Sequence, residues 1–156
     1  MTIRFAKTED IPGMLELLRQ VGQVHRDLRP DLFRDGAQKY DHAALAELLT
    51  DPSRPIFIAA DGGKVLGYCF CVRKECREHP IFLDRTEFYI DDLCVDESCR
   101  GQGVATNLYR FVTDYAKETG CTHITLNVWC GNKSAQNFYE KMGMTQRNIT
   151  MEMKLC

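Results

Sequence analysis

The stretch CRGQGVATNLY, residues 99–109, constrains the fold more than any other, because it joins a strand-like segment to an amphipathic helix through two glycines. Gly101 and Gly103 can adopt positive φ angles, which lets a bulky ligand approach the main chain. The first N–H groups of the helix that follows have no acceptor within it and lie at the positive end of its dipole. With the charge of Arg100, this turn predicts a site for an anion such as a pyrophosphate, although the same glycines would also suit a simple tight turn.

Two common nucleotide-binding motifs are absent from this turn. A dinucleotide fingerprint, G-x-G-x-x-G, needs a third glycine at the position of Thr106, and no acidic residue follows at a spacing that would clearly bind a ribose. A P-loop needs a Gly-Lys-Ser/Thr sequence, which the chain lacks. Neither of these two nucleotide-binding folds is therefore expected.

The hydrophobic periodicity predicts strands and helices along the chain. Strands are expected over residues 2–6, 56–60, 64–73, 86–95, 122–128 and 144–155. Helices are expected over residues 8–22, 37–50, 103–119 and 132–142. The two strands that flank Gly62 and Gly63 predict an antiparallel hairpin. The strand, helix and strand that follow predict a right-handed parallel crossover.

Length and charge limit the class of protein. The 156 residues suit one domain, 1–156, with a single core. A formal net charge of −2 gives no general attraction for nucleic acid, and no apolar stretch approaches the ~20 residues needed to span a bilayer. The N-terminus enters a strand-like segment without the features of a signal peptide. We therefore expect a cytoplasmic protein with no nucleic-acid or membrane partner.

The eight cysteines allow two interpretations. Without a secretion signal, reduced thiols are favoured over disulfides. Cys71 and Cys76, together with Cys94 and Cys99, have spacings that could supply zinc in a cysteine-metal structural domain. The simpler interpretation is that Cys71 and Cys94 lie within strands as small buried hydrophobic residues, and no metal is expected.

The turn and its surroundings resemble the GNAT superfamily of acetyl-CoA dependent N-acetyltransferases. Arg100, Gly103 and Ala105 match its Arg/Gln-x-x-Gly-x-Gly/Ala signature, and the strand sequence IDDLCVDESC precedes them. The later stretch NVWCGNKSAQNFYEKMGM, residues 127–144, resembles the second half-site of the family. Because motifs and element order agree, the resemblance implies an α/β fold: a twisted mixed sheet of about six to seven strands with four helices, splayed between two central parallel strands.

The resemblance also implies acetyl-CoA, or coenzyme A, as the co-substrate. Its pantetheine arm would pair with main chain at Leu93, Cys94 and Val95 as an added strand does. The residues expected around its pyrophosphate are Arg100, Gly101, Gln102, Gly103, Val104, Ala105 and Thr106. Asn132, Ser134 and Tyr139 of the later half-site complete the expected cofactor contacts.

Acetyl transfer to an amine needs a proton acceptor and a proton donor. Through the resemblance, Tyr139 is expected to protonate the departing thiolate, although aromatic residues at such helical positions often fill a core. Asp91 is the first choice for a base, acting through water or by attracting the cation, and Asp92 and Glu87 are the other candidates. Asp92 faces the opposite side of a regular strand from Asp91, so only a bulge would bring both into one site.

The expected acceptor is the primary amine of a small cationic molecule or of a peptide. It would attack the thioester directly and pass through a tetrahedral intermediate. The resemblance places the substrate wall in or near the connection VHRDLRPDLF, residues 24–33. The candidate substrate contacts are His25, Asp27, Phe33 and Tyr40.

Other interpretations of the chain stay open at this point. One is a coenzyme A binding or sensor module that has the fold without the catalysis. Another is covalent catalysis through Cys94 or Cys130, for which no Cys/His pair is evident. A homodimer is also considered.

Overall fold

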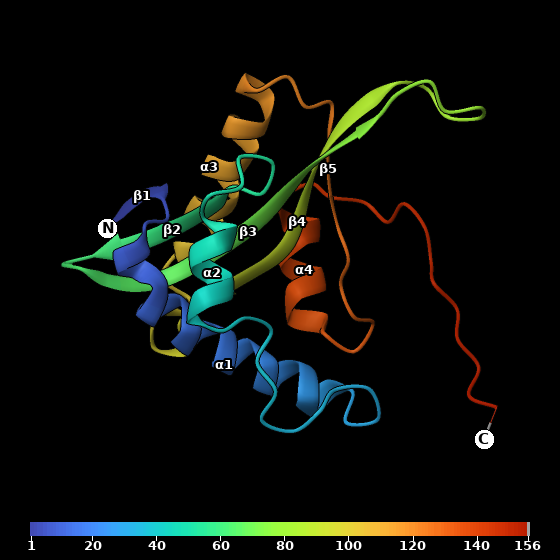
Figure 1. The fold of residues 1–156 in the computed structure, drawn as a ribbon. Coiled ribbons are helices and arrows are strands. Elements are labelled where there is room, and N and C mark those ends of the chain that lie inside the picture. The colour runs from blue at the N-terminus through green and yellow to red at the C-terminus, as the bar shows by residue number, and fades with distance from the viewer. Residues whose placement is uncertain (156) are drawn as a thin grey trace.

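A five-stranded mixed sheet carries the structure (Figure 1). The computed structural model describes residues 1–155, so Cys156, the last residue of the expected domain, lies outside the described residues. The strands are β1 (Thr2–Phe5), β2 (Ile56–Asp61), β3 (Lys64–Cys76), β4 (Arg85–Val95) and β5 (His123–Leu126). They lie side by side in sequence order, antiparallel from β1 to β4 and parallel between β4 and β5.

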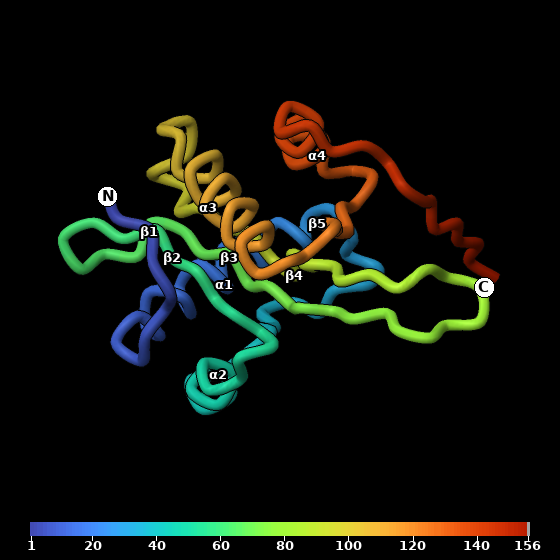
Figure 2. Tube along the Cα trace, turned by 90° about the horizontal axis from the view of Figure 1, so that it is seen from above, coloured from blue at the N-terminus to red at the C-terminus, as the bar shows by residue number. Residues whose placement is uncertain are grey.

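Four α-helices cover both faces of this sheet within the described residues. They are α1 (Ile11–Leu28), α2 (His42–Leu48), α3 (Val104–Glu118) and α4 (Lys133–Lys141), with short 3-10 turns η1 (Thr8–Asp10) and η2 (Glu97–Cys99). α1 and α2 pack on one face, and α3 and α4 pack on the other (Figure 2). The predicted α/β class with four helices is confirmed. Within residues 1–155, none of the helices has the length and apolar character to cross a membrane.

The β4–α3–β5 unit is the predicted parallel crossover. α3 begins directly after the glycine turn and packs onto the sheet through Leu108 and Val112. β4 and β5 pair only from Glu87, opposite His123, to Ile90, opposite Leu126. β4 then continues to Val95 paired with β3 alone. The two parallel strands therefore separate as expected and leave one edge of β4 without a neighbouring strand.

Two helix boundaries differ from the expectation. The predicted end of the first helix at Gly22 is wrong, because α1 continues to Leu28. Gly22 lies within the helix, where a Cβ atom would make only an ordinary contact of 3.4 Å with the carbonyl oxygen of Ala37. The second helix, expected over 37–50, begins only after Asp41, whose carboxylate caps α2 by accepting a hydrogen bond from the N–H of Ala44.

The prediction of a last strand is also wrong. Residues 144–155 form no strand, so the sheet within residues 1–155 has five strands rather than about six to seven. The alternation of apolar side chains favoured a strand, but a strand also needs a neighbour for its backbone N–H and C=O groups. No described strand pairs with this segment, and its apolar side chains from Ile149 onward lie exposed.

At Gly13, α1 packs closely against β3 because this residue has no side chain between the two elements. A Cβ atom at Gly13 would lie 2.7 Å from Cγ2 of Val65, a stiff β-branched residue. We predict that Gly13→Ala destabilises the fold by about 1–3 kcal/mol, because overpacking outweighs the ~1 kcal/mol by which alanine favours a helix over glycine. Thermal unfolding of the purified variant measures this.

Gly22→Ala, in the same helix, is the matched control. Its added methyl group would meet its nearest neighbour at an ordinary contact distance of 3.4 Å. The melting temperature of this variant is expected to stay the same or to rise. Equal melting temperatures for the two variants would contradict the packing explanation.

Candidate active site

The glycine turn between β4 and α3 has the geometry of an anion site. Gly101 and Gly103 adopt φ angles of 74° and 81°, and no atom lies within 4 Å of the place where a Cβ of Gly101 would be. No side chain caps α3, so the N–H groups of its first turn, which includes Val104, Ala105 and Thr106, stay free for a ligand. Nε of Arg100 donates to the carbonyl of Val95 at 3.4 Å, which holds this exposed cation beside the turn. These residues fit a phosphorylated ligand.

Gln102 supports the same turn from its outer side. Its Nε2 donates to the carbonyl of Ser98 at 3.1 Å, and the side chain of Asp96 accepts from the N–H of Ser98. These local hydrogen bonds hold η2 in place directly before the glycines.

The end of β4 presents the edge that the sequence predicted for the pantetheine arm. Leu93, Cys94 and Val95 pair with β3 on one side, and β5 has already separated on the other. The Cys94 side chain points into the α1 core, where its thiol contacts the carbonyl of Leu17 at 3.6 Å. Burial raises the pKa of this thiol to about 12, so it stays protonated at neutral pH and covalent catalysis through Cys94 loses its basis.

A bulge in β4 puts two carboxylates on one face of the sheet. Asp92 lies opposite Phe70 and Ile90 lies opposite Cys71, which leaves Asp91 as an extra residue with no partner on β3. The alternation of side chains is therefore shifted by one residue, and both aspartates face the α1 and α2 side. Asp91 Oδ2 accepts from Lys39 Nζ at 2.6 Å, and Asp92 Oδ2 accepts from the Tyr68 hydroxyl at 2.7 Å. The bulge that is needed to bring Asp91 and Asp92 to one face is therefore present.

Burial and neighbouring charges set the protonation of Asp92, Lys39 and Tyr68. Burial raises the pKa of the Asp92 carboxyl, and the hydrogen bond from Tyr68 and the charges of Lys39 and His25 offset this only in part. Burial lowers the pKa of the Lys39 ammonium, but its hydrogen bond and ion pair with Asp91 outweigh that effect and raise this pKa overall. Burial, followed by the charge of Asp92, raises the pKa of Tyr68 well above its usual value. Lys39 is therefore a bound ammonium ion.

Tyr139 lies on α4, on the other side of β4. Its ring packs against Tyr109 and Phe138, with centroid distances of 6.2 and 5.1 Å. Burial raises the pKa of its phenol, and nearby Cys69 and Asp92 raise it further. Its hydroxyl has no hydrogen-bond partner among residues 1–155. The arrangement provides a protonated phenol that is free to donate.

Two of the predicted site residues lie apart from this group. The Glu87 carboxylate accepts hydrogen bonds from Arg85 and Arg147 at 2.6 and 2.7 Å, at the end of β4 that still pairs with β5. Asp27 lies on the exposed side of α1 and accepts from Nε2 of Gln23 at 2.7 Å. The structure does not bring either carboxylate to Asp91 and Asp92.

An aromatic wall stands beside the two aspartates. His25 stacks on Phe33 at 5.2 Å, and Phe33 meets Trp129 edge to face at 5.5 Å. His25 reaches this position because α1 continues past Gly22, and it lies close enough to Asp92 to influence that carboxyl. The wall thus combines α1, the connection after it and the segment after β5.

Tyr40, which was also predicted as a substrate contact, packs against other side chains of the fold. It stacks on Phe70 at 5.8 Å, and its hydroxyl accepts from Arg54 at 3.3 Å. Sequence reasoning missed Lys39, Tyr68 and Trp129. The one signal available for them was that Trp129 is the only tryptophan of the chain and directly follows a predicted strand.

The start of α4 has a structural role. The side chain of Asn132 accepts from the N–H of Ala135 at 3.1 Å and caps this helix. Ser134 lies exposed in its first turn. Because the Asn132 oxygen already accepts the capping bond, its amide N–H groups are the main polar groups that it can offer to a ligand.

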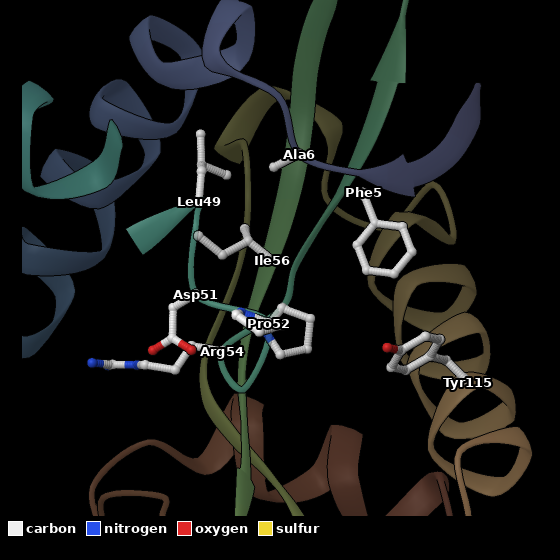
Figure 3. Close-up of a pocket in the computed structure, with 9 residues that line it drawn as sticks. Phe5, Ala6, Leu49, Asp51, Pro52, Arg54, Ile56 and Tyr115 are labelled. Carbon is white, nitrogen blue, oxygen red and sulfur yellow. The ribbon is translucent and has the colours of Figure 1, made fainter. Parts of the chain in front are cut away.

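The cavity shown in Figure 3 is a separate feature. It has a volume of about 290 Å³ and lies between the end of β1, the loop before β2 and Tyr115 of α3. Asp51 and Arg54 give it its polar lining. None of the predicted site residues lines it, so it is not the candidate active site.

The cysteines do not gather at one place. Within residues 1–155 there is no group of three or more His, Cys, Asp or Glu side chains that could hold a metal ion. Cys69, Cys71 and Cys94 are buried among apolar side chains, as small hydrophobic residues would be. The cysteines of the described residues are free thiols. The cysteine-zinc interpretation has no support in this part of the chain.

Comparison with known proteins agrees with this geometry. A model of the Acetyltransferase (GNAT) family matches residues 21–144. A thialysine N-epsilon-acetyltransferase of Bos taurus is 28% identical over 151 residues, which cover 90% of this chain and 82% of that protein. A solved structure of a mutant Bacillus halodurans protein is 28% identical and superposes with a TM-score of 0.95 over 100% of both chains.

A third neighbour carries a ligand of the expected kind. It is an aminoglycoside N-acetyltransferase solved in complex with coenzyme A, 18% identical, with a TM-score of 0.69 over 99% of this chain and all of that one. At this identity the likeness concerns the fold alone. Since the matched family model spans well over half of the sequence, the chain belongs to the Acetyltransferase (GNAT) family and is an N-acetyltransferase that uses acetyl-CoA.

Proposed function

We propose that this enzyme transfers the acetyl group of acetyl-CoA to a primary amine of a small cationic molecule or a peptide. The observation that carries the proposal is the β4 bulge, which places Asp91 and Asp92 together on one face of β4. Beyond Ile90, the edge of this strand that faces away from β3 is open. An ammonium ion, that of Lys39, already lies at 2.6 Å from Asp91. The similarity to a protein named for N-epsilon acetylation of thialysine also favours a primary amine.

In this proposal the turn and the β4 edge hold acetyl-CoA. The free N–H groups of residues 101–106 and the Arg100 guanidinium would bind its pyrophosphate. The main chain of Leu93, Cys94 and Val95 would pair with its amide groups as with an added strand. A main-chain N–H near Cys94 or Val95 would stabilise the oxyanion, a contact whose loss costs about 3 kcal/mol. Asn132 and Ser134 are secondary contacts.

The two proton transfers take place on opposite sides of β4. Asp91 and Asp92 attract the substrate ammonium, and the raised pKa of Asp92 makes it the better match for taking a proton, directly or through water. Tyr139, on the α4 side, holds its proton and donates it to the departing thiolate. His25, Phe33 and Trp129 form the wall against which the acceptor lies. Glu87 has no part in this scheme.

Several expectations stay predictions. They are that residues 1–156 form one domain, that the protein is cytoplasmic, that it needs no metal and that it does not bind nucleic acid. A homodimer is likewise a proposal, and the exposed segment after α4 supports it.

A panel of amines and lysine peptides, assayed by the mass of the acetylated product, tests the function directly. We expect acetyl-CoA to raise the melting temperature, by mass action on the native state. Arg100→Ala should weaken this shift, while Arg110→Ala on the exposed side of α3 should not. A thermal shift without transfer to any amine would instead favour a binding or sensor module.

Tyr139→Phe tests the proton donor. We expect kcat to fall about 100-fold or more with little change in the KM for acetyl-CoA, because the ring still packs but the hydroxyl is lost. Tyr115→Phe on α3, whose ring packs against Phe57 and Phe88, is the matched control. Equal kcat values for the two variants would remove Tyr139 from the mechanism.

Asp92→Asn tests the buried carboxyl. Because folding raises the pKa of Asp92, this group binds its proton more tightly in the native state and costs stability as the pH rises above ~4, the ordinary value for a carboxyl. We expect the variant to lose activity but to melt a few degrees higher, with a larger gain at alkaline than at acidic pH. The amide can still accept from Tyr68.

Melting curves over a pH series measure this gain. Asp35→Asn, an exposed carboxylate in the connection between α1 and α2, is the control and should leave the pH profile unchanged. A gain for Asp92→Asn that is the same at every pH would contradict the assigned protonation.

Lys39→Met tests whether the resident ammonium competes with the substrate. Since Lys39 Nζ occupies the Asp91 carboxylate, its removal should lower the KM for cationic amines severalfold and leave the KM for acetyl-CoA unchanged. Lys117→Met on the exposed side of α3 should change neither value. An increased KM for the amine would show that Lys39 helps to bind the acceptor.

A further inference from the structure

Tyr68 of β3 is a buried phenol that reaches one of the two aspartates. Its side chain is 0% exposed, and its hydroxyl donates to Oδ2 of Asp92 at 2.7 Å. This is the length of a charge-assisted hydrogen bond from a hydroxyl to a carboxylate. A buried hydroxyl needs a hydrogen-bond partner, and here the carboxylate supplies it.

The register between β3 and β4 makes this contact possible. Tyr68 lies opposite Cys94 and Asp92 lies opposite Phe70, so Tyr68 and Asp92 are diagonal neighbours on the same face. The strands approach each other closely at this point. A Cβ atom at Gly67 would lie 2.9 Å from the carbonyl oxygen of Cys94, so the residue before Tyr68 has to be small.

The ring of Tyr68 is fixed by the side chains around it. It meets Phe70 edge to face at 4.7 Å, and Phe70 stacks on Tyr40 at 5.8 Å. Tyr68 also belongs to the core that α1 forms with the sheet, together with Met14 and Leu17. A phenol that is packed this tightly on a strand cannot follow a moving carboxylate, so it determines where Oδ2 of Asp92 lies.

The second carboxylate oxygen of Asp92 stays available. Oδ1 accepts no hydrogen bond from residues 1–155, and it is not one of their buried polar atoms without a partner. Water or a bound amine can therefore reach it. The Lys39 ammonium binds Asp91 and not Asp92. Asp92 thus has one oxygen that is held and one that is free.

We propose that Tyr68 is a positioning residue that holds Asp92 in place as the acceptor of the substrate proton. The inference rests on the proposed acetyl transfer with Asp92 as the base. In that step an N–H bond of the substrate ammonium breaks, the electron pair stays on nitrogen, and an O–H bond forms at Oδ1, directly or through water. The phenol favours the ionised carboxylate before the step, because its hydrogen bond stabilises the charged form.

Tyr68 itself does not exchange a proton in this scheme. Burial, followed by the charge of Asp92, raises the pKa of its phenol well above the usual value. The hydroxyl therefore keeps its proton and acts on the amine only through Asp92.

Titratable and charged groups surround Asp92 from several elements. They are Tyr68 and Cys69 of β3, Asp91 and Cys94 of β4, His25 of α1, Lys39 of the connection before α2 and Tyr139 of α4. Burial has the largest influence and raises the pKa of the Asp92 carboxyl, and the hydrogen bond from Tyr68 comes next and lowers it. Removal of this hydroxyl should therefore raise the pKa of Asp92 further.

The pH dependence of kcat/KM for one amine, at saturating acetyl-CoA, tests Tyr68→Phe. The acidic limb of this profile reports the ionisation of the base before the amine binds. We expect the variant to move the limb upward by about one pH unit or more, with activity about tenfold lower on the limb and largely recovered above it. Tyr115→Phe removes an aromatic hydroxyl on the other side of the sheet and should leave the profile unchanged.

A second variant, 3-fluorotyrosine in place of Tyr68, tests the same contact with almost no change of shape. Fluorine makes the hydroxyl more acidic and therefore a stronger donor to the carboxylate. The acidic limb should move to lower pH, opposite to its movement in Tyr68→Phe. If Tyr68→Phe does not fold, this variant decides the test, and a limb that stays in place overturns the inference.

Melting curves provide a readout that needs no turnover. Tyr68→Phe should lose more melting temperature at neutral pH than near pH ~4, because the higher pKa of Asp92 costs stability only where the unfolded carboxyl is ionised. This pH dependence should disappear when Asp92→Asn is also present, since the two residues are then uncoupled.

The possible failures can be told apart. An unchanged acidic limb in Tyr68→Phe, or an equal loss of activity at every pH, would reduce Tyr68 to a packing role and overturn the inference while Asp92 remains the base. Full activity in Asp92→Asn would instead refute the proposed base on which the inference rests.

Discussion

The one-residue bulge at Asp91 is the constraint on which the rest of the site depends. Up to Ile90, β4 has a strand on both sides, and beyond the bulge it has one only on the β3 side. The extra residue shifts the alternation of side chains and turns two successive aspartates to one face. The two carboxylates therefore lie next to the part of β4 where β5 no longer pairs with it. A regular strand would turn the two aspartates to opposite faces.

Because the bulged strand lies between two helical layers, different kinds of side chain gather on its two faces. The α1 and α2 side holds carboxylates, an ammonium and an aromatic wall. The α3 and α4 side holds the phenol of Tyr139 among apolar and aromatic side chains. Burial raises the pKa of both Asp92 and Tyr139, so each is more ready to hold a proton than it would be in water. Asp92 on β4 and Tyr139 on α4 therefore lie on opposite sides of the same strand.

The sequence predicted those parts of the fold that depend on neighbouring residues in the chain. The glycine turn at 101–103, the start of α3 and the parallel crossover follow from residue types that have few other uses. The end of α1 was predicted wrongly because a glycine does not by itself end a helix, and Gly22 lies inside one that continues to Leu28. The strand expected over 144–155 has the right alternation, but pairing is a property of the neighbours and not of the segment.

The candidate site, too, could be predicted from the sequence only in part. Asp91 and Asp92 were predicted as candidates from their position before the turn, while their joint orientation depended on a bulge that no single residue marks. Lys39 and Tyr68 were missed because their roles come from contacts across 52 and 24 positions of the chain. Glu87 was predicted for the site from the same acidic run, yet Arg85 and Arg147 hold it elsewhere. Long-range contacts of this type need the tertiary structure.

The contact between Lys39 and Asp91 has a thermodynamic consequence for acceptor binding. In the proposed function, an incoming ammonium displaces that of Lys39 from Asp91, but the Lys39 charge stays attached to the chain nearby. The lost contact and the repulsion between the two cations offset part of the attraction that the carboxylate offers. Under that proposal, discrimination between amines falls largely to shape and to contacts with the wall of His25, Phe33 and Trp129.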